Sequence, residues 1–224
     1  MIAWYLRRRF TVLFVTLLAT LAVGPLREAL GLESGPLDVL IAINLVAAAA
    51  GISDHPGRRR VLVVVSAAVV GTRFLPTVLV PAAIESVADL TWVVIAALAA
   101  LAGVRYALRA TTVDGEHVAA ALSAYLLAGL VFAVLYLLVD HARPGSLVDP
   151  AGGALTLESA IYFSYVTLAT LGYGDIVPRS EMARGLAVFE AVGAQLYLTV
   201  TIAMLVGLYA QGAGRHRSNR EDRS

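Results

Sequence analysis

The sequence contains no cysteine and no lysine, and only 15% of its 224 residues are charged. Without cysteine the chain forms no disulfide, no thiolate metal site and no cysteine nucleophile. All 17 basic residues are arginine, the net charge is only +1, and the arginines do not gather on one soluble face that would bind nucleic acid. The sequence has no Walker loop, metal-ligand cluster or catalytic-triad spacing, so we expect neither an enzyme nor a cofactor.

Hydrophobic residues make up 59% of the chain, against about 45–50% in a typical soluble domain. This excess indicates that lipid surrounds much of the protein. Hydrophobic runs of about 17–25 residues can cross a bilayer as helices. Six such runs cover residues 10–26, 36–52, 61–80, 87–106, 118–139 and 183–209. We therefore predict an all-α membrane protein with six transmembrane helices, in the cell membrane.

The first run could also be a secretory signal, because a basic start precedes an apolar middle, but we interpret it as a true span. Most arginines fall on one side of the membrane if six helices alternate, which predicts that both termini are cytoplasmic. Residues 157–169 form a further apolar stretch that is only about 20 Å long as a helix. This stretch is too short to cross and is typical of a re-entrant helix between the last two spans.

The segment that carries the chemistry runs over residues 167–178, with the sequence Thr-Leu-Ala-Thr-Leu-Gly-Tyr-Gly-Asp-Ile-Val-Pro. Its glycines, two residues apart, permit positive φ, so successive carbonyls can point to one side. Non-helical backbone at membrane depth is tolerated only inside protein or beside water. Such strands from several subunits would stack oxygens that replace the water around a cation. A carboxylate at the mouth would raise the local cation concentration.

This segment resembles the selectivity filter of the potassium channel superfamily, usually Thr-Val-Gly-Tyr-Gly-Asp. Leu171 departs from the usual valine, with its side chain expected behind the filter. The resemblance covers residues 118–209 and implies a homotetramer around one pore in the lipid bilayer, with K+ as the transported ion. The implied K+ ligands are the carbonyls of Thr170, Leu171, Gly172 and Tyr173, while Gly174 completes the filter and Asp175 forms its mouth.

Two further side chains are candidates for filter support. Tyr162 stands where relatives often have a tryptophan that holds the mouth aspartate, so it either bonds Asp175 or merely packs. Glu190 is an acid inside the sixth span, which is a functional hypothesis by default. We expect it behind the filter, hydrogen-bonded to the re-entrant helix; a neutral acid tied to a backbone carbonyl is the alternative.

The sixth span also contains candidates for gating and for the cavity wall. Gly193 is either a gating hinge or a site of close helix packing. One helical stripe is the preferred cavity lining, and Tyr197 with Thr201 forms the rival stripe. The preferred stripe consists of Gln195, Leu198, Ile202 and Val206.

The first four spans resemble a voltage-sensor domain that lacks gating charges, because residues 91–104 contain no basic residue. Arg105 and Arg109 are interpreted as anchors at the membrane surface. Arg73 is the candidate charge in the third span and could pair with Asp38, Glu85 or Asp89. We expect a sensor-like unit over residues 1–110, a pore unit over 111–210 and a polar cytoplasmic tail over 211–224.

The sequence therefore predicts a potassium-selective channel that is not strongly voltage-gated. The alternatives are a weakly selective cation channel, suggested by Leu171, a regulatory subunit of a channel complex, and a potassium transporter subunit. The exclusive use of arginine beside abundant alanine, valine and leucine favours a bacterial source.

Overall fold

The computed structural model describes residues 8–30, 40, 43–44, 46–49, 56–73, 82–108, 114–148, 152 and 154–221. Its helices are α2 (Arg9–Leu30), α4 (Pro56–Arg73), α5 (Ala82–Leu108), α6 (Gly115–Ala142), α7 (Leu157–Leu168) and α8 (Glu181–Glu221). The short strands β1 (Leu147–Val148) and β2 (Val177–Pro178) pair antiparallel, with Leu147 opposite Pro178. The mostly helical content agrees with the predicted all-α class, which did not anticipate this strand pair.

Within the described residues, three helices are long and apolar enough to cross a membrane. They lie at Thr91–Leu108 in α5, Gly115–Ala142 in α6 and Glu181–Leu208 in α8. A shorter apolar helix covers Arg9–Ala22 in α2. The predicted span over 36–52 lies largely outside the described residues, as does 74–80 of the third, so the count of six stays a prediction.

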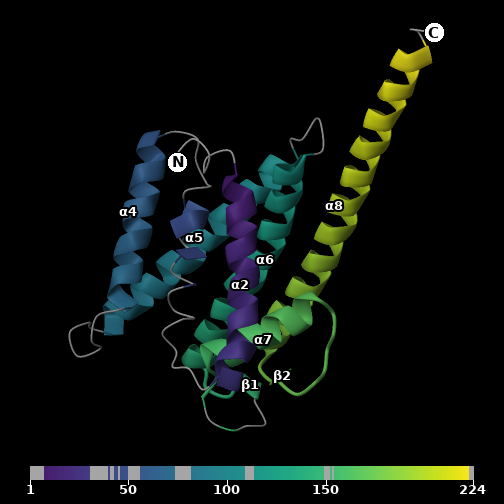
Figure 1. Cartoon of the computed structure of the whole chain (residues 1–224). Coiled ribbons are helices and arrows are strands. Elements are labelled where there is room, and N and C mark those ends of the chain that lie inside the picture. The colour runs from purple at the N-terminus through teal and green to yellow at the C-terminus, as the bar shows by residue number, and fades with distance from the viewer. Residues whose placement is uncertain are drawn as a thin grey trace.

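Helices α2, α5 and α6 pack side by side around one apolar cluster, and α4 lies beside α5 (Figure 1). Phe10, Leu13 and Leu17 of α2 are buried in this cluster, together with Ala120 and Leu127 of α6. The apolar side chains of α2 thus bury one helix face against the outer helix of the predicted pore unit. This packing joins the N-terminal helices to α6, the first helix of the predicted pore unit.

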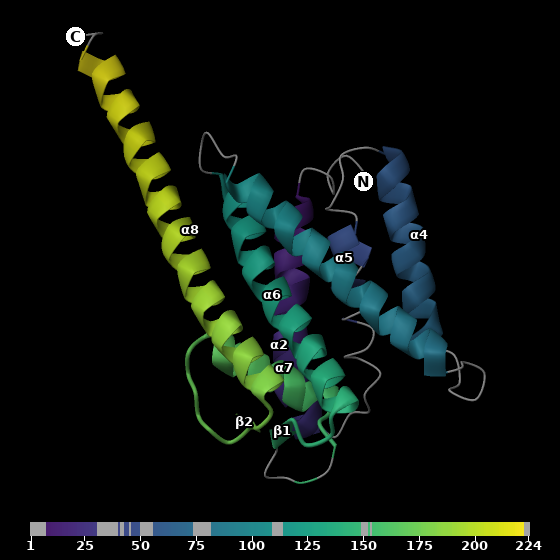
Figure 2. The same ribbon diagram turned by 180° about the vertical axis from the view of Figure 1, so that it is seen from behind.

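Helix α8 stands at the edge of the molecule. Both views show it beside α7 and α6 near its start and leaning away from the other helices toward its C-terminal end (Figures 1 and 2). Only 11% of the apolar stretch that could cross a membrane is buried in α8, against 44% in α6. Its backbone stays helical through Glu221, so the boundary predicted at residue 210 is not a break in the helix.

Candidate ion-conducting site

The loop that follows α7 has an unusual backbone. Thr170, Gly172 and Gly174 have φ values of 58°, 59° and 77°, so every second residue is left-handed. Positive φ at both glycines confirms what their spacing predicts. Changing the sign of φ at alternate residues lets successive carbonyls face one side, whereas they alternate along an ordinary strand.

Thr170 is the part of this backbone that the sequence did not predict. Positive φ is a genuine outlier for a β-branched residue, and the left-handed conformation costs roughly 1–2 kcal/mol. Two hydrogen bonds hold the start of the loop against the last turn of α7: Thr170 N donates to Thr167 O, and Leu171 N donates to Val166 O, both at 2.9 Å. Strained backbone that is retained by its surroundings is typical of functional sites.

The short helix α7 is the platform for this loop, and its bounds agree with the predicted re-entrant helix. Thr156 is the N-cap, and its hydroxyl accepts a hydrogen bond from Ser159 N at 3.1 Å. The helix ends at Leu168 with Ala169 as the C-cap. Its C-terminal end, which carries a partial negative charge, therefore directly precedes the irregular loop.

The side chains of the loop have little cover within one chain. Tyr173 is 66% exposed and Leu171 is 55% exposed. In Figure 1 the segment between α7 and β2 runs as an open arc beside the start of α8. An apolar side chain and a phenol ring that are this exposed are typical of a surface that another protein segment covers.

Of the two alternatives for Tyr162, the contact with Asp175 is present. The Tyr162 hydroxyl donates to Asp175 Oδ2 at 2.6 Å, and Ile176 N donates to Oδ1 at 2.9 Å. The Tyr162 hydrogen bond is the main cause that lowers the pKa of Asp175, and the same bond raises the pKa of Tyr162 to about 12. The carboxylate thus stays charged at the end of the loop.

Tyr162→Phe is expected to make the loop more sensitive to acid. A lowered carboxyl pKa means that the contact stabilises the folded loop above the ordinary aspartate value of about 3.9 and loses that effect as the pH falls through the folded pKa. Removing the hydroxyl raises the Asp175 pKa, so protonation begins at higher pH. If the loop conducts cations, as its resemblance implies, titration with acid from the side of Asp175 should inhibit the current at higher pH in the variant. An unchanged titration would contradict this role.

Three polar contacts and one close approach fix α7 against α6. The Tyr165 hydroxyl donates to Leu126 O at 2.7 Å, and the Ser164 hydroxyl lies 2.7 Å from Gly129 O. The Tyr125 hydroxyl of α6 donates to the carbonyl of Leu168 at 3.1 Å. A Cβ added at Gly129 would lie 2.6 Å from the Tyr165 ring. These residues were not predicted, because the sequence does not say which face of α6 meets α7.

The far end of the loop is tied to the end of α6. Ser146 O accepts from Arg179 N at 2.7 Å, next to the pairing of β1 with β2. Asp140, which is buried near the end of α6, accepts from Leu147 N at 3.1 Å. Both ends of the loop are therefore anchored, while its middle is open.

Glu190 of α8 is only 1% exposed and lies against α7, as predicted. Its Oε1 is 2.5 Å from the Ser164 hydroxyl, and its Oε2 accepts from the Tyr136 hydroxyl at 2.7 Å. Tyr136 is itself fully buried and packs edge-on against the Phe163 ring. This cluster of polar side chains joins α6, α7 and α8 behind the loop.

The candidates farther along α8 are not all brought together. Helix α8 is continuous through Gly193, and a Cβ added there would meet nothing within 4 Å, so close packing within this chain does not explain the glycine. Gln195 and Ile202 are exposed, and Leu198 is half-buried. The rival stripe faces α6, because the Tyr197 hydroxyl donates to Ala121 O at 2.7 Å and Thr201 is buried. The preferred stripe thus stays a prediction.

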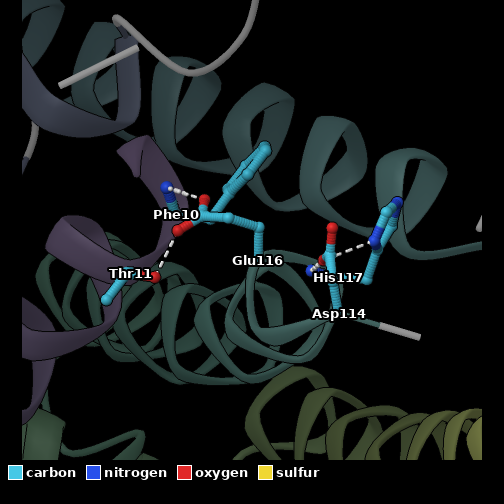
Figure 3. A network of polar contacts seen from close by, with 5 residues as sticks. All are labelled: Phe10, Thr11, Asp114, Glu116 and His117. Atoms are coloured by element: carbon cyan, nitrogen blue, oxygen red, sulfur yellow. Dashed lines mark hydrogen bonds and ion pairs between the residues drawn. The ribbon is translucent and has the colours of Figure 1, made fainter. Parts of the chain in front are cut away.

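Figure 3 shows a polar junction between α2 and the start of α6. Glu116 accepts from Phe10 N at 3.2 Å and from the Thr11 hydroxyl, so a carboxylate on α6 caps the first turn of α2. Asp114, the N-cap of α6, accepts from His117 N at 2.9 Å and lies 2.6 Å from His117 Nδ1. These bonds lower the pKa of Asp114, with the His117 amide as the largest cause.

The charges predicted for the sensor-like unit are only partly described. Arg105 is exposed near the end of α5, which agrees with a surface anchor. The proposed pairing of Arg73 with other charges, and the position of Arg109, lie outside the described side chains. The side chains of its candidate partners, Asp38, Glu85 and Asp89, lie outside the described ones as well.

Comparison with known proteins identifies similarity over the region that contains this site. Residues 120–211 match a family described as "Ion channel". The inward rectifier potassium channel Kirbac3.1 of Paramagnetospirillum magnetotacticum is 32% identical over 91 residues, which are 39% of this chain and 28% of that protein. The two pore potassium channel c of Oryza sativa subsp. japonica is 40% identical over 63 residues, 28% of this chain and 12% of that protein.

No solved structure gives a significant match. The chain spans less than a third of the length of the curated relatives that it matches. The similar region contains most of α6, all of α7 and the loop, and α8 as far as residue 211. The apolar helices and this match indicate a membrane protein whose residues 120–211 are similar to the ion channel family.

Proposed function

We propose that this chain is one subunit of a homotetrameric, potassium-selective channel of a cell membrane, with both termini cytoplasmic. Dehydrated K+ passes between carbonyl oxygens of the 170–173 backbone, and the Asp175 carboxylate concentrates cations at the outer mouth. The observation that carries the proposal is positive φ at Thr170, Gly172 and Gly174, in a loop that follows a short helix between two apolar helices.

The exposure of the loop and of α8 supports assembly around a shared axis. One loop supplies one side of an ion cage, so several copies are needed to surround a dehydrated cation. The face of α8 presents a row of exposed apolar side chains that neighbouring subunits, or lipid, would cover. These are Val188, Phe189, Val192, Leu196, Val200, Ile202 and Val206.

Flux through liposomes tests the proposal. Purified protein reconstituted in liposomes should carry potassium but little sodium, and barium should block the potassium flux, because it fits the same carbonyl cage with a higher charge. Equal potassium and sodium flux would favour a weakly selective cation channel, the alternative that Leu171 suggests. No flux at all from a tetrameric preparation would favour a regulatory subunit.

Opening is expected to depend only weakly on voltage. Moving one charge across the membrane supplies only about 2.3 kcal/mol per 100 mV, so steep gating needs several basic residues within the bilayer. Residues 91–104 of α5 contain none. Recordings over both signs of potential should give shallow curves of open probability against voltage. A steep curve, equivalent to several gating charges per channel, would refute this reading of the N-terminal helices.

A further inference from the structure

The buried cluster behind the loop contains one more acceptor than its hydroxyl protons can satisfy. Ser164 Oγ lies 2.7 Å from Gly129 O and 2.5 Å from Glu190 Oε1. A serine hydroxyl has one proton and can donate only one hydrogen bond. A backbone carbonyl accepts and never donates. If Glu190 were ionised, one of these two short contacts would therefore bring Ser164 Oγ against an acceptor oxygen with no proton between them.

We infer that Glu190 is a neutral carboxylic acid that positions the short helix α7 through Ser164, and that loss of its proton breaks one of the three polar contacts that hold this helix against α6. In the neutral state Tyr136 donates to Glu190, Glu190 donates to Ser164, and Ser164 donates to Gly129 O. All three oxygens are then satisfied in a directed chain. The cost of burying an unpaired carboxylate inside the membrane favours the same state.

Deprotonation changes the direction of one bond. An ionised Glu190 accepts from both Tyr136 and Ser164, so the Ser164 hydroxyl turns to the carboxylate and leaves Gly129 O. The α7 helix then loses one of its bonds to α6, about one turn before the helix ends and the loop begins. The proton leaves to solvent, and no other covalent bond changes. This step rests on the proposed function only in that the displaced helix carries the conducting loop.

The other titratable groups near Glu190 are tyrosines. Tyr136 from α6 donates a hydrogen bond to it, while Tyr125 from α6 and Tyr165 from α7 lie near enough for its charge to act on their hydroxyls. Within the described residues no arginine pairs with Glu190. The acidic group at the start of this helix, Glu181, is exposed and lies 3.5 Å from Arg184, which makes it a matched control.

The decisive variant is Glu190→Gln. Its amide nitrogen donates to Ser164 and its amide oxygen accepts from Tyr136, as the neutral acid does, but it has no proton to lose. We expect the variant to conduct at neutral pH and to keep its potassium current as the pH is raised to about 9. This limit lies below the ordinary tyrosine pKa of about 10, so the tyrosines keep their protons. The wild type and Glu181→Gln should lose current over the same range.

Infrared difference spectra separate this inference from the proposed function. Wild-type protein at neutral pH should show a protonated-carboxyl C=O band that is missing in Glu190→Gln and disappears at alkaline pH. This band in a protein that does not conduct would overturn the proposed function and leave the neutral acid standing. Its absence, or an alkaline loss of current that Glu190→Gln shares with the wild type, would overturn the inference. A Glu190→Gln tetramer that fails to conduct beside a conducting wild type would overturn it too.

Discussion

Replacing Gly172 or Gly174 with alanine is expected to abolish selective potassium conduction. Both glycines have positive φ, where a Cβ costs roughly 1–2 kcal/mol in each subunit. In the proposed tetramer this strain occurs four times around one ring. Relief of the strain turns carbonyls away from the axis, so the oxygen cage no longer replaces the hydration shell. The measurement is the potassium-to-sodium permeability ratio.

Two controls separate strain in the loop from general damage. Gly145→Ala places the same strain outside the loop, because Gly145 has φ of 81° and lies in the turn before β1. Leu171→Val shortens one side chain of the loop by one methylene and leaves the backbone conformation of the loop unchanged. Both should keep conduction, and the second should match or improve selectivity. If the alanine variants at 172 or 174 behaved like these controls, the loop would not select the ion.

Gly129→Ala is expected to displace the short helix α7. An added Cβ would lie 2.6 Å from the Tyr165 ring, which is closer than packed atoms can stay. Overpacking of this kind costs typically 1–3 kcal/mol, and here it would also lengthen the 2.7 Å contact between Ser164 and Gly129 O. We expect lower thermal stability in detergent together with loss of potassium current.

The matched control is Gly71→Ala in α4, where an added Cβ meets nothing within 4 Å. It should leave stability and current nearly unchanged. Combining Gly129→Ala with Tyr165→Leu removes the ring that clashes, so the double variant should lose less than the two single effects added together. If the effects of the two substitutions were fully additive, Gly129 would not be required to accommodate the Tyr165 ring.

The local features of the site could be predicted from the sequence. The bounds of α7 and the positive φ of Gly172 and Gly174 all depend on residues that lie next to one another in the chain. The contact of Tyr162 with Asp175 crosses only 13 positions. It was one of two readings, and the structure supports the hydrogen bond.

The contacts with α6 could not be predicted in the same way. The approach of Tyr165 to Gly129, and the bond from Tyr136 to Glu190, depend on which face of α6 meets α7 and α8. Helix α6 is apolar on all sides, so its sequence does not say which face is which. The positive φ of Thr170 was also missed, because a β-branched residue gives no signal for a left-handed backbone.

The most direct test of potassium selection by the 170–175 loop is the reversal potential of the purified protein with potassium on one side of the membrane and sodium on the other. We expect a reversal potential far from zero, with the sign that potassium permeation and sodium exclusion produce. We also expect this displacement to disappear in Gly172→Ala. A wild-type reversal potential near zero, or one that Gly172→Ala leaves unchanged, would contradict potassium selection by this loop.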